Sequence, residues 1–415
     1  MEYSTFFKLK KQNQNFWRFS GNEKKYISDL FRNGLKFKDF SFSERLENKW
    51  SKIHNLKYSV CINSCTSALH VAFLSIGIKK GDEVLVPALT PIMCGSTIHL
   101  AGGIPVYVDV NPETFLLDEE DLKKKITSKT KAVLAVHMYS GICNLNNLKK
   151  ICKKKKIFLI EDCAEAVGAR DENKKLTGTV GDISCWSFQA AKQLTSGDGG
   201  ILATNNKLLA KKIRKYSNLG FKTLEADNNK VSISKDERQN PNFKRFDEIG
   251  FNYRMNEFTA SIALAQTEQM QKFIKLRRNS AKEFEKVFLR NKHFKIQKIP
   301  KTAYSTYYTF AVLLLKKNSS KLNWFKFRKK FMYFGGDGIY AASRLIHQEP
   351  AIKKYKIGRC FKKCSKSCVI YCKGTPNAKE LQKKLLLFTT NQSNSFEIRK
   401  QIRALKKTIS YFNLN

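Results

Sequence analysis

Short apolar segments that alternate with helix-like segments over residues 58–204 constrain the fold of this 415-residue chain most strongly. We predict strands at 58–63, 83–87, 105–109, 132–137, 157–161, 183–188 and 200–204. Strands that alternate with helices form mainly parallel sheets with helices on both faces. The sequence therefore predicts an α/β protein, and such proteins bind ligands beyond the carboxyl ends of their strands.

A single lysine, Lys192, lies between the predicted strands 183–188 and 200–204, among small and neutral residues. A lysine that forms a Schiff base with a carbonyl group needs a poorly hydrated site, because such a site lowers the pKa of the amine. The alternative is an ordinary surface lysine in a turn, since lysine is abundant in this chain. Lys192 alone therefore does not decide the chemistry.

Asp162 follows the predicted strand 157–161, where a carboxylate can face a ligand. A pyridoxal phosphate enzyme needs a lysine for the aldehyde, a carboxylate for the pyridine nitrogen and a cradle for the phosphate. The alternative role of such a carboxylate is to cap the following helix. Asp162 and Lys192 together thus indicate two of the three required groups.

The small polar residues 64–67 (SCTS) lie between the predicted strand 58–63 and a predicted helix at 68–74. Backbone N–H groups and hydroxyls at a helix N-terminus can hold an anion, which the helix dipole also favours. Ordinary N-capping by Ser64 or Thr66 is the alternative. This segment is the candidate phosphate cradle.

These segments, in this order, resemble the DegT/DnrJ/StrS family of pyridoxal phosphate-dependent sugar aminotransferases. The matching segments are 63–69 (NSCTSAL), 81–90 (GDEVLVPALT), 102–109 (GGIPVYVD), 161–166 (EDCAEA), 181–200 and 250–257 (GFNYRMNE). The similarity extends from about Trp17 to the C-terminus. It implies fold type I, which is aspartate aminotransferase-like, with a mainly parallel seven-stranded sheet in a large domain and a smaller C-terminal α/β domain.

The resemblance implies a role for each site residue. Lys192 would bond to the aldehyde of pyridoxal 5′-phosphate and move protons, and Asp162 would pair with the pyridine nitrogen. Further cofactor contacts are implied for Cys65, Thr66, Ser67, Glu165, Ser187, Gln189 and Asn252. Because Asn252 would reach the neighbouring subunit, a homodimer with a shared active site is expected. Substrate contacts are implied for Thr90, Tyr253, Arg254 and His347.

Three positions depart from the family pattern. Cys65 replaces a glycine of the phosphate turn, Pro91 replaces an aromatic residue that stacks on the cofactor, and Leu219 replaces a histidine. None of them is Lys192 or Asp162, so they bear on substrate and affinity and not on the reaction class.

The expected reaction moves an amino group from an amino acid, L-glutamate by resemblance, to a keto-sugar nucleotide. Such a reaction serves the biosynthesis of amino sugars and cell-surface polysaccharides. Two alternatives remain open: amination of a cyclitol or another cyclic ketone, and a non-catalytic regulator that binds pyridoxal phosphate. The presence of Lys192, Asp162 and Ser187 argues against the regulator.

The net charge of +42 raises the possibility of a nucleic-acid partner. Most of this charge comes from lysines spread along the chain, whereas arginine is the better reader of phosphates and bases. We therefore expect no nucleic-acid partner. No apolar run approaches the ~20 residues of a membrane span, and the N-terminus lacks the apolar segment of a signal peptide, so we expect a cytoplasmic protein without a membrane partner.

The chain has 11 cysteines, which should be free thiols in a cytosolic protein. Four of them recur at every fourth position: Cys360, Cys364, Cys368 and Cys372. Zinc sites usually show closer pairs, such as two cysteines separated by two residues. We expect no metal.

We predict a boundary between an N-terminal arm with the large domain, 1–290, and a small domain, 291–415. Helices are expected at 23–32, 43–54 with Ser43 as N-cap, 256–290, 322–334, 378–387 and 396–410. Residues 304–315 should form a strand, and the polar residues 222–242 should form a loop.

Overall fold

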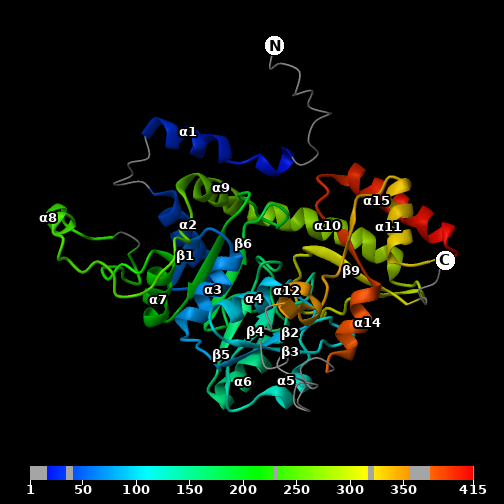
Figure 1. Cartoon of the computed structure of the whole chain (residues 1–415). Coiled ribbons are helices and arrows are strands. Elements are labelled where there is room, and N and C mark those ends of the chain that lie inside the picture. Colours follow the sequence, from blue (N-terminus) through cyan, green and yellow to red (C-terminus); the bar gives the residue numbers. More distant parts are fainter. Residues whose placement is uncertain (1–15, 34–40, 229–230, 316–321, 355–373, 415) are drawn as a thin grey trace, which may run out of the picture.

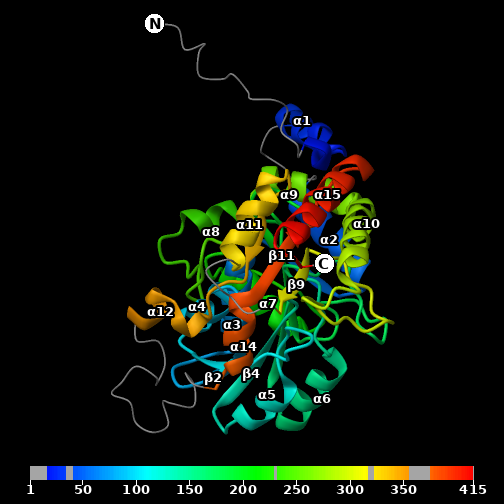
Figure 2. The same ribbon diagram turned by 90° about the vertical axis from the view of Figure 1, so that its right-hand side faces the viewer.

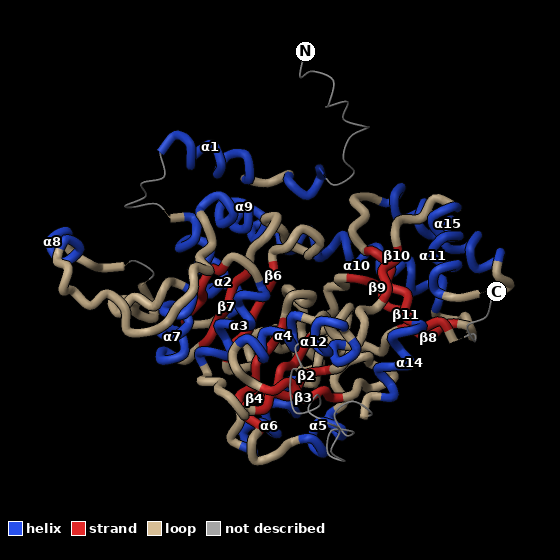
Figure 3. The backbone as a smooth tube through the Cα atoms, viewed as in Figure 1, coloured by secondary structure: helices blue, strands red, loops and turns tan. Residues whose placement is uncertain are grey.

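Two separate sheets organise the chain in the computed structural model (Figure 1), which describes residues 16–414 except 34–40, 229–230, 316–321 and 355–373. The larger sheet has seven strands in the order β1-β7-β6-β5-β4-β2-β3, and the smaller has four in the order β10-β11-β9-β8. Figure 3 shows the two groups of strands apart from each other. The predicted α/β class is confirmed.

The strands of the large sheet are β1 (Tyr58–Ile62), β2 (Glu83–Pro87), β3 (Ile104–Val108), β4 (Thr130–Val136), β5 (Phe158–Asp162), β6 (Ile183–Ser187) and β7 (Gly200–Thr204). All seven predicted strands are present, with bounds shifted by two residues at most. Strands β3, β2, β4, β5 and β6 run parallel, whereas β7 runs antiparallel to both β6 and β1. The predicted, mainly parallel sheet is therefore confirmed.

Helices follow the strands of the large sheet and cover it: α3 (Cys65–Ser75), α4 (Met93–Leu100), α5 (Glu119–Lys125), α6 (Leu145–Lys155) and α7 (Lys207–Ser217). Val84, Leu85 and Val86 of β2 are all fully buried, as expected for strands covered on both faces. Helix α3 packs against β6 and β7, and this contact brings its N-terminus to the carboxyl edge of the sheet.

The N-terminal segment consists of η2 (Phe16–Phe19), α1 (Glu23–Asn33) and α2 (Phe42–His54), and both α1 and α2 pack on α9 (Glu257–Glu268). Figure 2 shows α1, α9, α10 (Met270–Phe288) and α15 (Ser395–Tyr411) at one end of the molecule, opposite α5 and α6. Among the described residues, no helix is both long and apolar enough to cross a membrane.

Two predictions about these helices were wrong. Residues 256–290 form two helices, because the backbone leaves helical geometry at Gln269 (φ −101°, ψ 9°), next to Glu268, which accepts hydrogen bonds from Asn22 and Tyr26. The N-cap of α2 is Ser41 and not Ser43, whose hydroxyl instead donates to Glu257. In both cases a distant contact overrides the local pattern.

The small sheet is antiparallel and contains β8 (Phe294–Ile296), β9 (Thr309–Leu314), β10 (Ile339–Ala341) and β11 (Leu385–Thr389). It is accompanied by α11 (Trp324–Tyr333), η3 (Ile346–Gln348), α12 (Pro350–Lys354), α14 (Pro376–Lys384) and α15. The predicted helix 378–387 was wrong at its end, since residues 385–389 pair between β9 and β10.

Two further segments differ from expectation. Residues 304–308 precede β9 and instead contact the large sheet's loops, with Tyr304 and Arg170 exchanging backbone hydrogen bonds. The predicted loop 222–242 contains a short helix, α8 (Lys235–Gln239), whose capping box pairs Ser234 with Glu237.

Candidate active site

A cavity of about 360 Å³ lies at the carboxyl edge of the large sheet. Its walls come from the start of α3, the segment that leads into α4, the ends of β4, β5 and β6, and the residues before β9. Seven residues predicted from the sequence line it: Cys65, Thr66, Asp162, Glu165, Ser187, Gln189 and Lys192. The fold thus gathers these seven residues from three separate segments of the chain, 65–66, 162–165 and 187–192.

Lys192 extends into this cavity from the loop between β6 and β7. Its Nζ lies 3.2 Å from Oε1 of Glu165 and 4.4 Å from the centre of the Tyr308 ring. Burial alone lowers the pKa of Lys192, but Glu165, Tyr308 and Asp162 together outweigh it and raise the pKa above its ordinary value. The contact between Glu165 and the ammonium group, which the sequence did not reveal, thus acts against the effect of burial on this pKa.

Asp162 is the last residue of β5 and is almost fully buried. Its Oδ1 accepts a hydrogen bond from the backbone N–H of Ala164 at 3.0 Å, and its Oδ2 accepts one from the thiol of Cys94 at 3.4 Å. The Cys65 sulfur lies 4.0 Å from Oδ1. Burial raises the pKa of both thiols well above the ordinary range, so both remain neutral donors that face the carboxylate.

The N-terminus of α3 forms one end of the cavity. Ser64 caps the helix by accepting a hydrogen bond from the backbone N–H of Ser67 at 3.1 Å, and the two hydroxyls lie 2.9 Å apart. In the described part of the chain, the N–H groups of Cys65 and Thr66 have no acceptor. Ser67 therefore serves in capping and does not line the cavity, whereas the two free N–H groups can bind an anion.

Glycine allows β7 to approach this helix end closely. A Cβ atom on Gly200 would lie 2.6 Å from the carbonyl carbon of Ser64 and 2.7 Å from the nitrogen of Cys65. Gly200 also pairs with Ser187, whose side chain lines the cavity. Although Cys65 stands where the resemblance implies a glycine, the close approach is made from the side of Gly200, and the residues present fit a phosphate group.

The other predicted site residues lie outside this cavity within a single chain. Thr90 is fully buried, and its hydroxyl lies 3.3 Å from the sulfur of Cys94. Tyr253 stacks on Phe251, with ring centres 5.0 Å apart. Asn252 and Arg254 are exposed and contact Asn218, through a backbone bridge and a side-chain hydrogen bond respectively.

His347 also lies away from the cavity, in η3. Its ring is buried against that of Tyr107, with centres 5.3 Å apart. Burial and the nearby Lys353 and Lys125 lower the pKa of His347 to about 4. His347 is therefore neutral at pH 7.

The structure adds residues that the sequence did not reveal. Tyr308 contributes an aromatic ring, and Cys94 contributes the thiol that donates to Asp162. Pro91, where the resemblance implies a stacking ring, lines the cavity with His137 and Tyr308. Tyr308 lies 116 positions from Lys192, and no local pattern indicates a contact of this kind.

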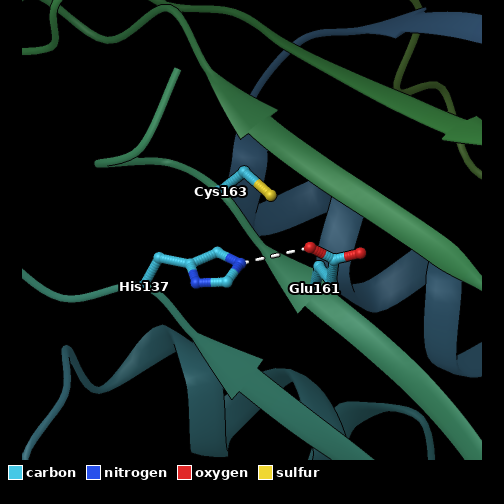
Figure 4. A group of neighbouring side chains, drawn as sticks. All are labelled: His137, Glu161 and Cys163. Atoms are coloured by element: carbon cyan, nitrogen blue, oxygen red, sulfur yellow. Dashed lines mark hydrogen bonds and ion pairs between the residues drawn. The ribbon is translucent and has the colours of Figure 1, made fainter. Parts of the chain in front are cut away.

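One group among the described residues has the spacing of a metal site: His137, Glu161 and Cys163. Figure 4 shows the imidazole facing Glu161. Nε2 of His137 lies 3.2 Å from Oε2 of Glu161. Nδ1 of His137 accepts the backbone N–H of Cys143. Glu161 also accepts the N–H groups of Gly178, Val180 and Gly181, so both ring nitrogens of His137 and both carboxylate oxygens of Glu161 are already engaged within the protein.

We therefore assign this group a structural role, in which Glu161 holds the turn before β6 against β5. The cysteine ladder Cys360, Cys364, Cys368 and Cys372 lies outside the described residues.

Comparison with known proteins finds similar aminotransferases and sugar-nucleotide enzymes. GDP-perosamine synthase of Escherichia coli O157:H7 is 34% identical over 294 residues, which is 71% of this chain and 75% of that protein. The L-glutamine:2-deoxy-scyllo-inosose aminotransferase of Streptomyces kanamyceticus is 30% identical over 275 residues, which is 66% of this chain and 62% of that protein.

Solved structures support the same fold. The crystal structure of NtdA from Bacillus subtilis with bound cofactor PMP superposes with a TM-score of 0.75 at 21% identity, covering 95% of this chain and 83% of that one. The DegT/DnrJ/EryC1/StrS aminotransferase family model matches residues 19–363. With this match over most of its length, the chain belongs to the DegT/DnrJ/EryC1/StrS aminotransferase family.

Proposed function

We propose that this aminotransferase uses pyridoxal 5′-phosphate to move an amino group from L-glutamate to a keto-sugar linked to a nucleotide. The observation that carries the proposal is the meeting of Lys192, Asp162 and the open N-terminus of α3 in one cavity. The similarity to GDP-perosamine synthase supports a sugar nucleotide as acceptor. The product would serve the synthesis of amino sugars for cell-surface polysaccharides.

When bound, the cofactor supplies an aldehyde that accepts the amine and a ring that withdraws electrons. Lys192 Nζ would hold that aldehyde and, once released, move the proton at the reacting carbon. Asp162 would keep the ring nitrogen protonated, because its buried carboxylate is held by the Ala164 N–H and the Cys94 thiol. Glu165, which contacts Lys192 Nζ, would stabilise the ammonium form between proton transfers.

The phosphate would be held by the N–H groups of Cys65 and Thr66 and by the Ser187 hydroxyl, with Gln189 beside it. Ser67 would act through its hydrogen bonds to the cap residue Ser64.

We further propose a cytoplasmic homodimer in which each subunit completes its partner's site. The exposed positions of Asn252 and Arg254 leave both side chains available to a neighbouring subunit. The substrate region beside Asn252 and Arg254 would be shaped by Tyr253, Thr90 and His347. The division into 1–290 and 291–415 places one sheet in each domain.

A second candidate substrate is a cyclitol. The relative from Streptomyces kanamyceticus is named for 2-deoxy-scyllo-inosose, which supports a cyclic ketone as an alternative acceptor.

Absorbance spectra of the purified protein with pyridoxal 5′-phosphate, recorded before and after addition of L-glutamate, test the proposal. A band of lysine-bound cofactor should appear and then convert to the pyridoxamine form. Nucleotide-linked keto-sugars and 2-deoxy-scyllo-inosose, added separately, should reverse the change only for the true acceptor class. Lys192→Ala should give no covalent band, and a band that L-glutamate leaves unchanged would indicate another donor or a regulator.

A further inference from the structure

Arg18 lies near the start of the chain, but its side chain contacts the loop that carries Lys192. It belongs to η2, is 6% exposed and lies 174 positions before Lys192. Its Nη1 donates to the carbonyl oxygen of Ala190 at 2.9 Å, and its Nη2 donates to the carbonyl oxygen of Lys192 itself. The planar guanidinium thus holds two carbonyls of one turn, which a lysine ammonium cannot do with the same geometry.

The segment around Arg18 is itself anchored beside that loop. Gln266 of α9 donates to the carbonyl oxygen of Arg18 and to Oε1 of Glu23 at 2.7 Å. The Oε1 of the same amide accepts the backbone N–H of Thr195, in the Lys192 loop, at 3.3 Å. The buried side chain of Gln266 therefore joins the N-terminal segment to the loop, and these hydrogen bonds fix the backbone of Arg18 beside the loop.

The charge on Arg18 is not matched by an acid. Among the residues that the structure describes, no ion pair joins a carboxylate to its guanidinium, and burial lowers the pKa of Arg18. A buried cation without an acidic partner is destabilising unless its hydrogen bonds are well satisfied. The two loop carbonyls are the acceptors described for this guanidinium, so its role is to hold the loop.

We propose that Arg18 is a positioning residue for Lys192, which makes the N-terminal segment 16–23 part of the active site. Lys192 lies on a turn outside the strands, and its Nζ must remain near both Glu165 and Tyr308. Arg18 fixes the backbone from which that side chain extends. The proposal rests on the proposed function, because it assumes that Lys192 is the residue that binds the cofactor.

A comparison of Arg18→Ala and Arg18→Lys with a matched control, Arg214→Lys, tests this role. Arg214 is equally buried and also donates to two fixed partners, the carboxylate of Glu47 and the carbonyl of Ser59, but its described hydrogen bonds include none to the loop that carries Lys192. The readouts are the rate of covalent attachment of pyridoxal 5′-phosphate, the pH midpoint of the resulting absorbance band, and kcat and KM for L-glutamate. Circular dichroism and thermal unfolding establish that each variant is folded.

Arg18→Ala should slow attachment by about 10- to 100-fold, shift the pH midpoint and lower kcat more than it raises KM, since small misplacements of a reacting group have effects of this size. Arg18→Lys should be intermediate, and it decides the matter if Arg18→Ala does not fold. Arg214→Lys should lose stability but attach cofactor at the wild-type rate.

Wild-type attachment and pH midpoint in folded Arg18 variants would overturn the positioning role, as would an equal defect in Arg214→Lys. Failure of the wild-type protein to attach the cofactor would instead refute the proposed function, and this inference with it.

Discussion

The substitution Gly200→Ala should damage the phosphate cradle through one methyl group. The new Cβ would lie 2.6 Å from the Ser64 carbonyl carbon, 2.7 Å from the Cys65 nitrogen and 2.8 Å from the Ser64 oxygen. All three are backbone atoms, which cannot rotate away as the end of a side chain can. Either the pairing of Gly200 with Ile62 opens or the N-terminus of α3 moves outward.

Overpacking of this kind costs about 1–3 kcal/mol. Unfolding entropy of about 2.1 cal/mol/K for each residue gives roughly 0.9 kcal/mol/K for 415 residues, so the Tm should fall by about 1–3 °C. The substitution should reduce the affinity for the cofactor proportionally more than it reduces the stability of the fold. A hydrogen bond to a charged group is worth about 1.5–3 kcal/mol, and 1.4 kcal/mol is tenfold in Kd. We expect affinity for pyridoxal 5′-phosphate to weaken at least about tenfold.

Gly197→Ala, in the loop that leads into β7, is the matched control. Gly197 has a φ of +88° and no atom within 4 Å of the added Cβ, so the substitution introduces backbone strain of roughly 1 kcal/mol without a clash. Titration of the cofactor by fluorescence should show near wild-type affinity for Gly197→Ala and a clear loss for Gly200→Ala. Equal affinities in the two variants would refute the assignment of the cradle.

Three further predictions concern charge and burial. Glu165→Gln removes the carboxylate that contributes most to raising the pKa of Lys192, so that pKa should fall and the pH profile of cofactor attachment should move to lower pH; a shift to higher pH would contradict the assigned contact. Burial lowers the pKa of His347 to about 4 from an ordinary 6.5, so the unfolded chain binds a proton at this residue more readily than the folded protein does. The folded protein therefore has its full stability above pH 6.5 and loses stability as the pH falls toward 4. In His347→Gln, up to about 3 kcal/mol of this loss of stability between pH 6.5 and pH 4 should disappear. Urea unfolding at pH 7 and pH 4.5 measures it, and the same loss of unfolding free energy in the variant and the wild type would count against the prediction. Burial raises the pKa of the Cys65 and Cys94 thiols, so both should react slowly with iodoacetamide at pH 7.5 although they line the cavity, and fast labelling in peptide mass spectra would disprove their neutral state.

Local sequence patterns were sufficient to predict the large sheet because its strands are apolar and separated by helices. Patterns failed where a distant partner decided the outcome. Residues 385–387 continue a helical segment in sequence, but they form a strand because β9 and β10 pair with them on both sides. The break at Gln269 likewise depends on the residues near α1 that contact Glu268.

The candidate site shows the same limit. Lys192 and Asp162 could be predicted, because each follows a strand and matches a family motif. The neighbours that set their properties could not be predicted from their own segments. Three such neighbours come close to these two residues only through tertiary folding. Arg18 donates to the backbone carbonyl of Lys192, Cys94 donates to Asp162, and the ring of Tyr308 lies beside the Lys192 ammonium group.

The antiparallel strand β7 has a consequence for the kinetics of folding. Its first residue, Gly200, is paired with Ile62 of β1 on one side and with Ser187 of β6 on the other. The contact with β1 closes a loop of more than a hundred residues, and such distant contacts form slowly compared with local ones. The cradle is therefore completed only when β7 has joined β1 to the rest of the sheet. During refolding, pyridoxal 5′-phosphate should accordingly bind only after β7 has paired with β1. Binding of the cofactor should therefore be slower than the recovery of helical structure.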